Sequence, residues 1–310
     1  MSLPALKGPY WVTVRQHRRV LWVLPSAAVA GLAAVVALRV WAVDPDADGV
    51  MTQTPNHAYS LLRICMEWAG GVLLFLPLLV GAFVAGPMIA RELESGTWRL
   101  ALSQSITARA WLGAKVVVAA AVAVLGSAAL AGVYRLGWSR VYGSYQFHWA
   151  DRGPYEAGGP VLIGYCLLAV AVGALVGQLI RRTLVAMAVT GLLTGLVLLC
   201  LGALRWSLLS VETITGPLSE KLAGRIPRSA MLVDSGYLTA TGERLPGYVC
   251  FQRTHSLQDC PVDLNVIGWY TDFHPISHYW LTQLVETSIV LALASAALYA
   301  AFRLGRARRG

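Results

Sequence analysis

Two histidines stand four residues apart near the C-terminal end of the sequence, within the run Asp272–His278. Two imidazoles at this spacing, with the carboxylate of Asp272 close by, are the side chains of a typical zinc site. Pro275, however, favours the first position of a helix, which would leave His274 at the cap and pointing away from His278. We therefore expect no metal site here, and we interpret the run as the start of an interfacial helix.

A charged stretch between two apolar segments suits a second kind of chemistry, the docking of a soluble partner. Residues 91–100 read Arg-Glu-Leu-Glu-Ser-Gly-Thr-Trp-Arg-Leu. Glu92 and Glu94 place negative charge among basic neighbours, Gly96 permits a bend or a close backbone approach, and Thr97 is a candidate helix cap. These features suit a short helix that docks on a partner. A solvated turn whose charges only fix the membrane topology is the open alternative.

A single carboxylate, Glu286, lies about two turns inside an apolar segment, by the rise of an α-helix. A carboxylate at that depth is costly unless it is protonated, paired or facing water, which makes Glu286 the intramembrane functional candidate. The alternative is a hydrogen bond to a neighbouring helix near the outer interface, because Glu286 does not lie at the bilayer midplane.

Motifs for nucleotide, protease or hydrolase chemistry are missing from the sequence. It contains no Gly-x-x-x-x-Gly-Lys-Ser/Thr loop, no His-Glu-x-x-His and no Gly-x-Ser-x-Gly. We therefore assign no catalytic residues to this chain.

The elements that position these residues follow from composition. Of the 310 residues, 56% are hydrophobic and 13% are charged, and the mean hydropathy is +0.59, which is too apolar for a soluble domain of this length. Six segments are long enough to span a bilayer as helices: Val20–Val43, Gly70–Ala90, Leu112–Tyr134, Pro160–Ile180, Thr183–Leu204 and Tyr279–Phe302. The fold class predicted is an all-α integral membrane protein with six transmembrane helices.

The formal charge of +9 is concentrated beside the ends of these segments on one predicted side. The basic residues there are Lys7, Arg15, Arg18, Arg19, Arg91, Arg99, Arg109, Lys115, Arg181, Arg182, Arg303, Arg306, Arg308 and Arg309. The positive-inside rule places that side, with both termini, in the cytoplasm, so the charge does not indicate nucleic-acid binding.

This topology divides the chain into four regions. Residues 1–19 form a cytoplasmic interfacial segment, and residues 20–204 hold helices one to five with a cytoplasmic connection at 91–110. Residues 205–278 form an extended extracytoplasmic loop, and residues 279–310 hold the sixth helix and a basic tail. Within the outer loop, Cys250 and Cys260 lie on the oxidising side, where a disulfide is preferred over two free thiols.

The connection between helices two and three resembles that of type-2 ABC transporter permeases. That family shares an Arg-Glu, a Gly-Thr, a Ser/Thr-x-x-Arg-like element and a lysine that opens helix three. This chain has Arg91-Glu92, Gly96-Thr97, Ile106-Thr107-Ala108-Arg109 and Lys115 in the same order. The N-terminal run Trp11–Arg18 is also similar to the pre-membrane segment of a bacterial branch of the family.

The resemblance implies a transmembrane subunit of an ABC exporter in the bacterial cytoplasmic (inner) membrane, moving a hydrophobic or amphipathic substrate. Residues coupled to the ATPase would be Arg91, Glu92, Glu94, Gly96, Thr97 and Arg99. The chain itself would hold no cofactor, since ATP and Mg²⁺ would be bound by two copies of a partner ATPase. A second permease subunit, identical or related, would complete the transporter. The small-residue pairs Gly173/Gly177 and Gly191/Gly195 more often pack helices within one subunit than between two.

Two functions from other classes stay open. One is an integral-membrane enzyme at the outer loops, with His274, His278, Asp272 and His255 as its groups. The other is a membrane scaffold that takes no part in transport and leaves a partner ATPase unstimulated.

Overall fold

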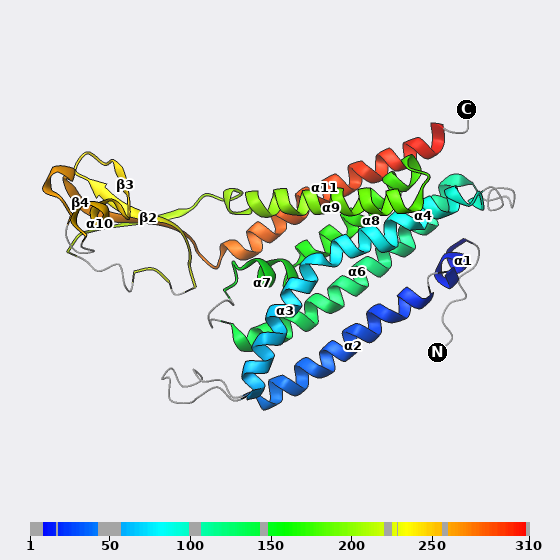
Figure 1. Ribbon diagram of the computed structural model, residues 1–310, viewed down its shortest axis with the longest axis horizontal. Coiled ribbons are helices and arrows are strands. Elements are labelled where there is room, and N and C mark those ends of the chain that lie inside the picture. The colour runs from blue at the N-terminus through cyan, green and yellow to red at the C-terminus, as the bar shows by residue number, and fades with distance from the viewer. Residues whose placement is uncertain are drawn as a thin grey trace. The chain divides into compact units, whose positions relative to one another are not determined.

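The computed structural model describes residues 9–16, 18–42, 57–98, 107–142, 148–219, 225–227, 229–255 and 260–307. The chain divides into two compact units, one made of Met1–Arg205 with Gln283–Gly310 and the other of Trp206–Thr282. Figure 1 shows that the first unit is helical and that the second is built around a sheet.

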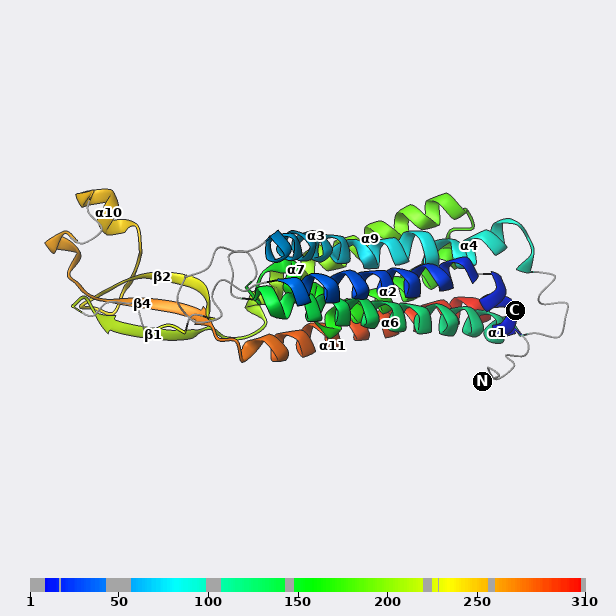
Figure 2. The same ribbon diagram turned by 90° about the horizontal axis from the view of Figure 1, so that it is seen from below.

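The helical unit contains a bundle of long helices that run side by side (Figures 1 and 2). Its elements are α1 (Pro9–Gln16), α2 (Arg18–Trp41), α3 (His57–Leu79), the π-helix η1 (Val80–Ala85), α4 (Gly86–Glu94), α6 (Ala108–Val141), α7 (Arg152–Ala157), α8 (Pro160–Leu179), α9 (Thr183–Leu204) and most of α11 (His278–Ala307).

Five helical stretches in the described part of the chain are long and apolar enough to cross a membrane. They are His57–Glu94, Ala108–Val141, Pro160–Leu179, Thr183–Ser207 and His278–Gly305. Helix α2 adds a shorter apolar stretch, Pro25–Trp41. The protein is therefore a multi-pass membrane protein, while the count of six spans and the side of each terminus stay predictions.

The helix that holds the predicted span Gly70–Ala90 begins earlier than predicted, at His57. Polar residues such as Arg63 and Glu67 interrupt the apolar ones in residues 57–69, so the mean hydropathy of this stretch is lower than that of the predicted segment.

Helix α6 likewise continues to Val141, beyond the predicted end at Tyr134. Polar contacts with α2 hold this extension: the Arg39 guanidinium donates to Ser139 Oγ at 2.6 Å and to the Leu136 carbonyl, and Arg140 donates to the Ala42 carbonyl at 3.1 Å. The predicted outer loop at 135–159 is correspondingly shorter, and it contains the short helix α7.

A wide helical turn separates α3 from α4. The Gly86 N–H donates to the carbonyl of Gly81, five residues earlier, where an α-helix would use a residue four earlier. Pro87 explains the change, because it has no N–H for the Phe83 carbonyl and its ring crowds that carbonyl. The helix therefore bends into a π-turn and continues to Glu94.

Small residues let α8 and α9 pack closely against this bent helix. A Cβ added at Gly173 would lie 2.4 Å from Ala85 Cβ, and one at Gly177 would lie 3.1 Å from Ile89 Cβ. A Cβ added at Gly191 of α9 would lie 3.5 Å from Ala82 Cβ, and one at Gly195 would lie 3.4 Å from Leu78 Cδ2, which are ordinary van der Waals contacts. Both glycine pairs thus pack helices within this chain.

Helix α8 is the most deeply buried of the candidate spans. On another side it meets α11, where Gly164 faces Val290 and Gln178 Nε2 donates to the Ala301 carbonyl at 3.0 Å. Small and polar contacts of this kind replace the hydrophobic effect, which lipid does not supply between helices.

The second unit corrects the all-α prediction, because it forms a four-stranded antiparallel sheet in the order β1-β4-β2-β3. Its elements are the end of η2 (Arg205–Ser207), β1 (Glu212–Pro217), β2 (Met231–Thr239), β3 (Arg244–Pro246), α10 (Val249–Thr254), η3 (Val262–Leu264) and β4 (Val266–His274), followed by the first turn of α11. The central strand β4 is rich in aromatic and β-branched residues, which suit a buried pleated surface. A disulfide joins Cys250 of α10 to Cys260.

The close packing of Gly173 predicts that Gly173→Ala destabilises the helical unit by about 1–3 kcal/mol, because the new methyl group meets Ala85 and the Gly86 backbone. The thermal unfolding midpoint of detergent-purified protein measures the effect. Gly132→Ala is the matched control, since a Cβ at Gly132 of α6 meets no described atom within 4 Å. Equal midpoints for the two variants would show that the α8–α4 packing is loose.

Candidate functional site

The last turn of α4 is held against α6 by Glu92. Its Oε1 pairs with Lys115 Nζ at 2.7 Å, and its Oε2 accepts a hydrogen bond from Trp111 Nε1 at 2.9 Å. Lys115 also donates to the Met88 carbonyl at 3.3 Å and is only 3% exposed. Sequence reasoning named Glu92 and Lys115 separately, and the structure brings them together as one ion pair.

Glu94, two residues further on, connects the same turn to α9. Its carboxylate accepts hydrogen bonds from the Thr183 backbone N–H, at 2.9 Å, and from the Thr183 hydroxyl. Thr183 is the first residue of α9, where backbone N–H groups lack helical partners and negative charge is favourable. Glu94 therefore acts as a cap for α9 that is supplied by another helix.

The residues that follow close α4 and leave an exposed surface. Ser95 is the C-cap, and Gly96 adopts φ +71°, the left-handed conformation that commonly ends a helix. Ser95 Oγ and Thr97 Oγ1 are 2.9 Å apart. Arg91, Ser95 and Thr97 are exposed. Arg99 lies outside the described residues.

Helix α6 begins after this connection and has its own cap. The Thr107 hydroxyl accepts a hydrogen bond from the Ala110 N–H at 3.2 Å. We refer to residues 91–97 as the α4 terminus; Glu92 ties it to α6, Glu94 ties it to α9, and its exposed side chains face solvent.

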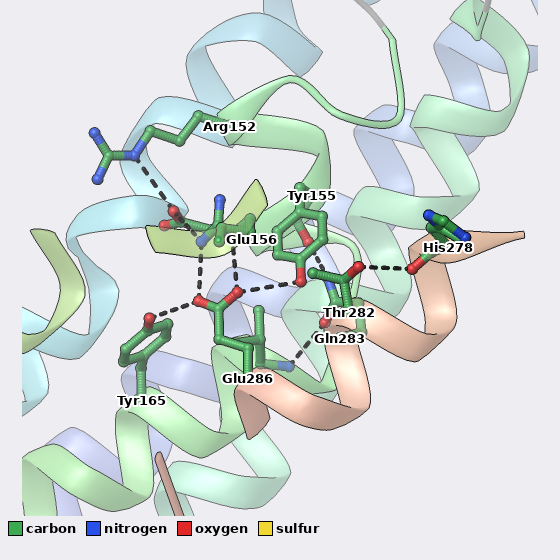
Figure 3. Close-up of polar contacts among 10 residues, drawn as sticks. Arg152, Tyr155, Glu156, Tyr165, His278, Thr282, Gln283 and Glu286 are labelled. Atoms are coloured by element: carbon green, nitrogen blue, oxygen red, sulfur yellow. Dashed lines mark hydrogen bonds and ion pairs between the residues drawn. The ribbon is translucent and has the colours of Figure 1, made fainter. Parts of the chain in front are cut away.

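Glu286 lies at the second site, fully buried in α11. Arg205, at the end of α9, pairs with both of its oxygens, through Nε at 2.8 Å and Nη2 at 3.0 Å. This bidentate geometry is the strongest arrangement between guanidinium and carboxylate. Tyr155 and Tyr165 also donate to Glu286, at 3.1 and 2.6 Å (Figure 3).

Glu156 of α7 completes this buried charge cluster. Its Oε1 accepts from Arg205 Nη2 at 2.8 Å and from Arg152 Nε at 3.3 Å (Figure 3 labels Arg152 and Glu156). Two carboxylates and two guanidiniums give formal charges that sum to zero. Three of the four side chains are buried, and Arg152 is 48% exposed. Glu156 Oε2 has no hydrogen-bond partner among the described residues.

Gln283 fixes α7 in place beside the cluster. Its Nε2 donates to the Tyr155 carbonyl at 2.6 Å, and its Oε1 accepts from the Val161 N–H at 3.2 Å (Figure 3). Sequence reasoning selected Glu286 but missed Arg205, which it placed at the start of the outer loop. The sequence feature that could have indicated this ion pair was a basic residue at the end of one apolar segment together with a single acidic residue inside another.

The histidines of the sheet unit are arranged differently from the expectation. Helix α11 begins at His278 rather than at Pro275, and His274 ends β4. The two Nδ1 atoms lie 3.0 Å apart, so the prediction that the rings point apart is wrong.

Asp272 does not complete a catalytic group with these histidines. Its oxygens accept from Thr213 Oγ1 at 2.6 Å and from Arg244 at 2.8 Å. His255 is an exposed residue at the end of α10. Among the described residues, no group of three or more His, Cys, Asp and Glu side chains is placed to hold a metal ion.

Comparison with known families decides the class of protein. The model of the family described as ABC-2 membrane transporter related matches residues 21–205, which is more than half of the 310-residue chain. The chain belongs to this ABC-2 family. The match confirms the resemblance to type-2 ABC permeases. Neither the curated proteins nor the solved structures gave a match.

Membership of the ABC-2 family makes the protein a membrane permease component of a transporter. Permeases of this family are typically non-catalytic transmembrane subunits, and membership implies partnering with an ABC ATPase. The matched range contains the α4 terminus and Arg205, while Glu286 lies beyond it.

The charge cluster predicts a large cost for Glu286→Ala. The substitution leaves Arg205 buried with one carboxylate where it had two, and removing one partner of a buried ion pair costs about 3–5 kcal/mol. Chemical denaturation of detergent-purified protein measures the loss. Ser288→Ala is the control, because Ser288 is exposed on the same helix. Equal stability of the two variants would contradict the importance of the pair.

The backbone of Gly96 predicts a difference between two substitutions of similar volume. Gly96→Val strains the left-handed conformation by about 1–2 kcal/mol, whereas Gly96→Asn is tolerated there. A Cβ at Gly96 meets no described atom within 4 Å, so steric overlap does not confuse the comparison. Hydrogen exchange at residues 93–97 should be about tenfold faster in the valine variant. Equal exchange rates would show that the φ of Gly96 is not required.

Proposed function

We propose that this protein is the permease subunit of an ATP-driven exporter in the bacterial cytoplasmic membrane, and that it is driven by a separate ATPase. The observation that carries the proposal is the pair of contacts from the α4 terminus. Glu92 connects it to α6 and Glu94 connects it to α9, so a displacement of this one turn would be passed from α4 to two further helices.

The proposal gives the residues of the α4 terminus two roles. Arg91, Ser95 and Thr97 are exposed and form the docking surface for the ATPase. Glu92 and Glu94 are engaged within the chain and transmit the movement. Gly96 lets the chain turn away from α4 directly after the docking residues. ATP and Mg²⁺ bind to the partner ATPase in this scheme.

The orientation of the α4 terminus toward the cytoplasm is supported by the positive-inside pattern of the sequence. Arg91, Arg181, Arg182 and Arg303 are exposed and follow or precede the ends of spanning helices on the same predicted side. A transporter of this family type uses two permease halves and two ATPase copies, so we propose that a second copy of this chain or a related subunit completes it.

A hydrophobic or amphipathic substrate suits the surfaces of the spanning helices. Their exposed side chains include many large apolar residues, such as Phe75, Phe83, Leu125 and Leu192. Such faces accommodate lipid, a second subunit or an apolar cargo.

Co-expression with the ATPase encoded beside the gene tests the proposal with two contrasting variants. Arg91→Glu reverses an exposed charge and should weaken co-purification of the ATPase about tenfold or more. Glu92→Gln breaks the ion pair with Lys115 without changing the docking surface, so the complex should form but its substrate-stimulated ATPase activity should fall several-fold.

Arg303→Glu is the matched control, since Arg303 is exposed near the end of α11 and lies on the same predicted side. It should leave both association and stimulation unchanged. Failure of the wild-type chain to bind the ATPase would overturn the exporter proposal and favour a membrane scaffold.

A further inference from the structure

The buried part of the charge cluster does not balance when both of its carboxyl groups are ionised. Glu156, Arg205 and Glu286 are 2% exposed or less, so two carboxylates share one guanidinium away from water. Arg152 brings the formal sum of the whole cluster to zero, but its side chain is 48% exposed. A net negative charge among buried side chains is strongly unfavourable. One proton on either carboxylate removes that charge.

The hydrogen bonds indicate which carboxylate can hold the proton. Both oxygens of Glu286 accept hydrogen bonds, which come from Arg205, Tyr155 and Tyr165 (Figure 3). Because such donors stabilise the ionised form, Glu286 keeps its charge. Glu156 accepts from both arginines of the cluster through Oε1, whereas its Oε2 has no hydrogen-bond partner among the described residues. A proton can therefore bind at Oε2 without breaking a contact.

We propose that Glu156 binds an exchangeable proton at Oε2, and that Arg152 becomes the principal partner of this carboxylate when the proton leaves to water. With the proton bound, Arg205 and Glu286 form the only buried pair of charges in the cluster, and Glu156 stays as a neutral acceptor for Arg205. With the proton released, the added negative charge attracts the guanidinium of Arg152, whose Nε lies 3.3 Å from Oε1. Proton binding is thereby linked to the position of Arg152.

Arg152 has both the access and the space that this exchange requires. It lies one helical turn before Glu156 in α7, so its side chain can approach without a change in the backbone. On the neighbouring helix α9, a Cβ added at Gly202 would lie 2.8 Å from Arg152 Nη2. The absence of a side chain at Gly202 thus leaves space for the guanidinium. The site lies at the end of α9 away from the α4 terminus, and it does not depend on the exporter proposal.

The groups around Glu156 act on its ionisation in opposite directions. Burial raises the pKa of Glu156, while the positive charges of Arg205 and Arg152 lower it, and burial has the larger effect. Titratable side chains on the other elements around α7 include Arg63 and Glu67 of α3, Tyr134 and Arg135 of α6, Tyr165 of α8 and Glu286 of α11. Arg63, Glu67 and Arg135 are exposed, so water and salt screen their charges from the buried carboxyl group.

Infrared difference spectroscopy of the full-length protein in lipid nanodiscs tests the proposal, because the carbonyl stretch of a protonated carboxyl group is separate from the carboxylate stretches. The wild type should show one protonated carboxyl group per chain at a pH above the range in which exposed carboxyl groups titrate. Glu156→Gln should lose this signal. Glu67→Gln is the matched control, since Glu67 is an exposed carboxylate of α3, and it should retain the signal.

Two further variants test the charge argument. Glu286→Gln leaves one carboxylate for Arg205, so Glu156 should ionise and the signal should disappear although Glu156 is still present. Arg152→Gln removes the cation that replaces the proton, so the signal should persist to a higher pH than in the wild type. Because Arg152 is half exposed, this variant keeps the fold even if Glu286→Gln does not, and circular dichroism checks both.

The pH dependence of stability gives a second readout. Since the pKa of Glu156 is raised in the folded chain, the folded chain holds the proton to a higher pH than the unfolded chain does. This contribution to stability is fully present below the unfolded pKa and is lost as the pH rises through the folded pKa. The thermal unfolding midpoint of the wild type should therefore fall over the pH range in which the infrared signal disappears. Glu156→Gln should not show that fall.

Several results would contradict the proton site. Absence of the signal in the wild type would overturn the proposal and show that Glu156 is ionised, with water on Oε2. Retention of the signal in Glu156→Gln or in a folded Glu286→Gln, or its loss in Glu67→Gln, would assign the proton to another group. A titration that is unchanged in Arg152→Gln would rule out the exchange with Arg152.

Discussion

The buried guanidinium of Arg205 is the constraint on which the outer part of the predicted membrane bundle depends. Moving an ion from water to a low-dielectric interior costs several kcal/mol even after relaxation, so the charge must be matched where it lies. Glu286 and Glu156 match it, and they come from helices α11 and α7. Helix α7 is only six residues long and would not be stable alone. The charge and the Gln283 hydrogen bonds therefore determine the position of three helices at once.

Helix α9 shows how polar contacts at two ends can hold an element that buries only one face. Its buried residues form one narrow stripe of Ala186, Thr190, Thr194 and Leu198. Glu94 holds its first residue, and the charge cluster holds Arg205 just after its last. A movement of the α4 terminus would thus reach the cluster through a single helix. If the α4 terminus and the charge cluster are coupled, helix α9 provides a continuous physical route between them.

Five of the six predicted spanning segments overlap candidate spanning helices of the structure, because apolarity over about 20 residues is a strong signal. Sequence reasoning did not locate the extensions of these segments, such as residues 57–69, since polar residues interrupt the apolar ones there. The strands were missed because the aromatic run in β4 was interpreted as part of a loop. Pairings are the hardest to predict: Glu92 and Lys115 are 23 residues apart, and Arg205 and Glu286 are 81 apart. The sequence pattern of one segment alone does not indicate which residue of the other segment it contacts.

The end of the family match can be compared with the position of the Arg205 charge and its carboxylate partners. The matched residues end at 205, so a fragment with these limits would contain Arg205 but not the carboxylate of Glu286. Glu156 alone would then face Arg205, with a single hydrogen bond where the whole chain provides three. Helix α11 is therefore an integral part of the membrane unit in this chain, although a sheet of four strands separates it in sequence from α9. In sequence, the sheet unit lies between Arg205 and Gln283, which both belong to the helical unit.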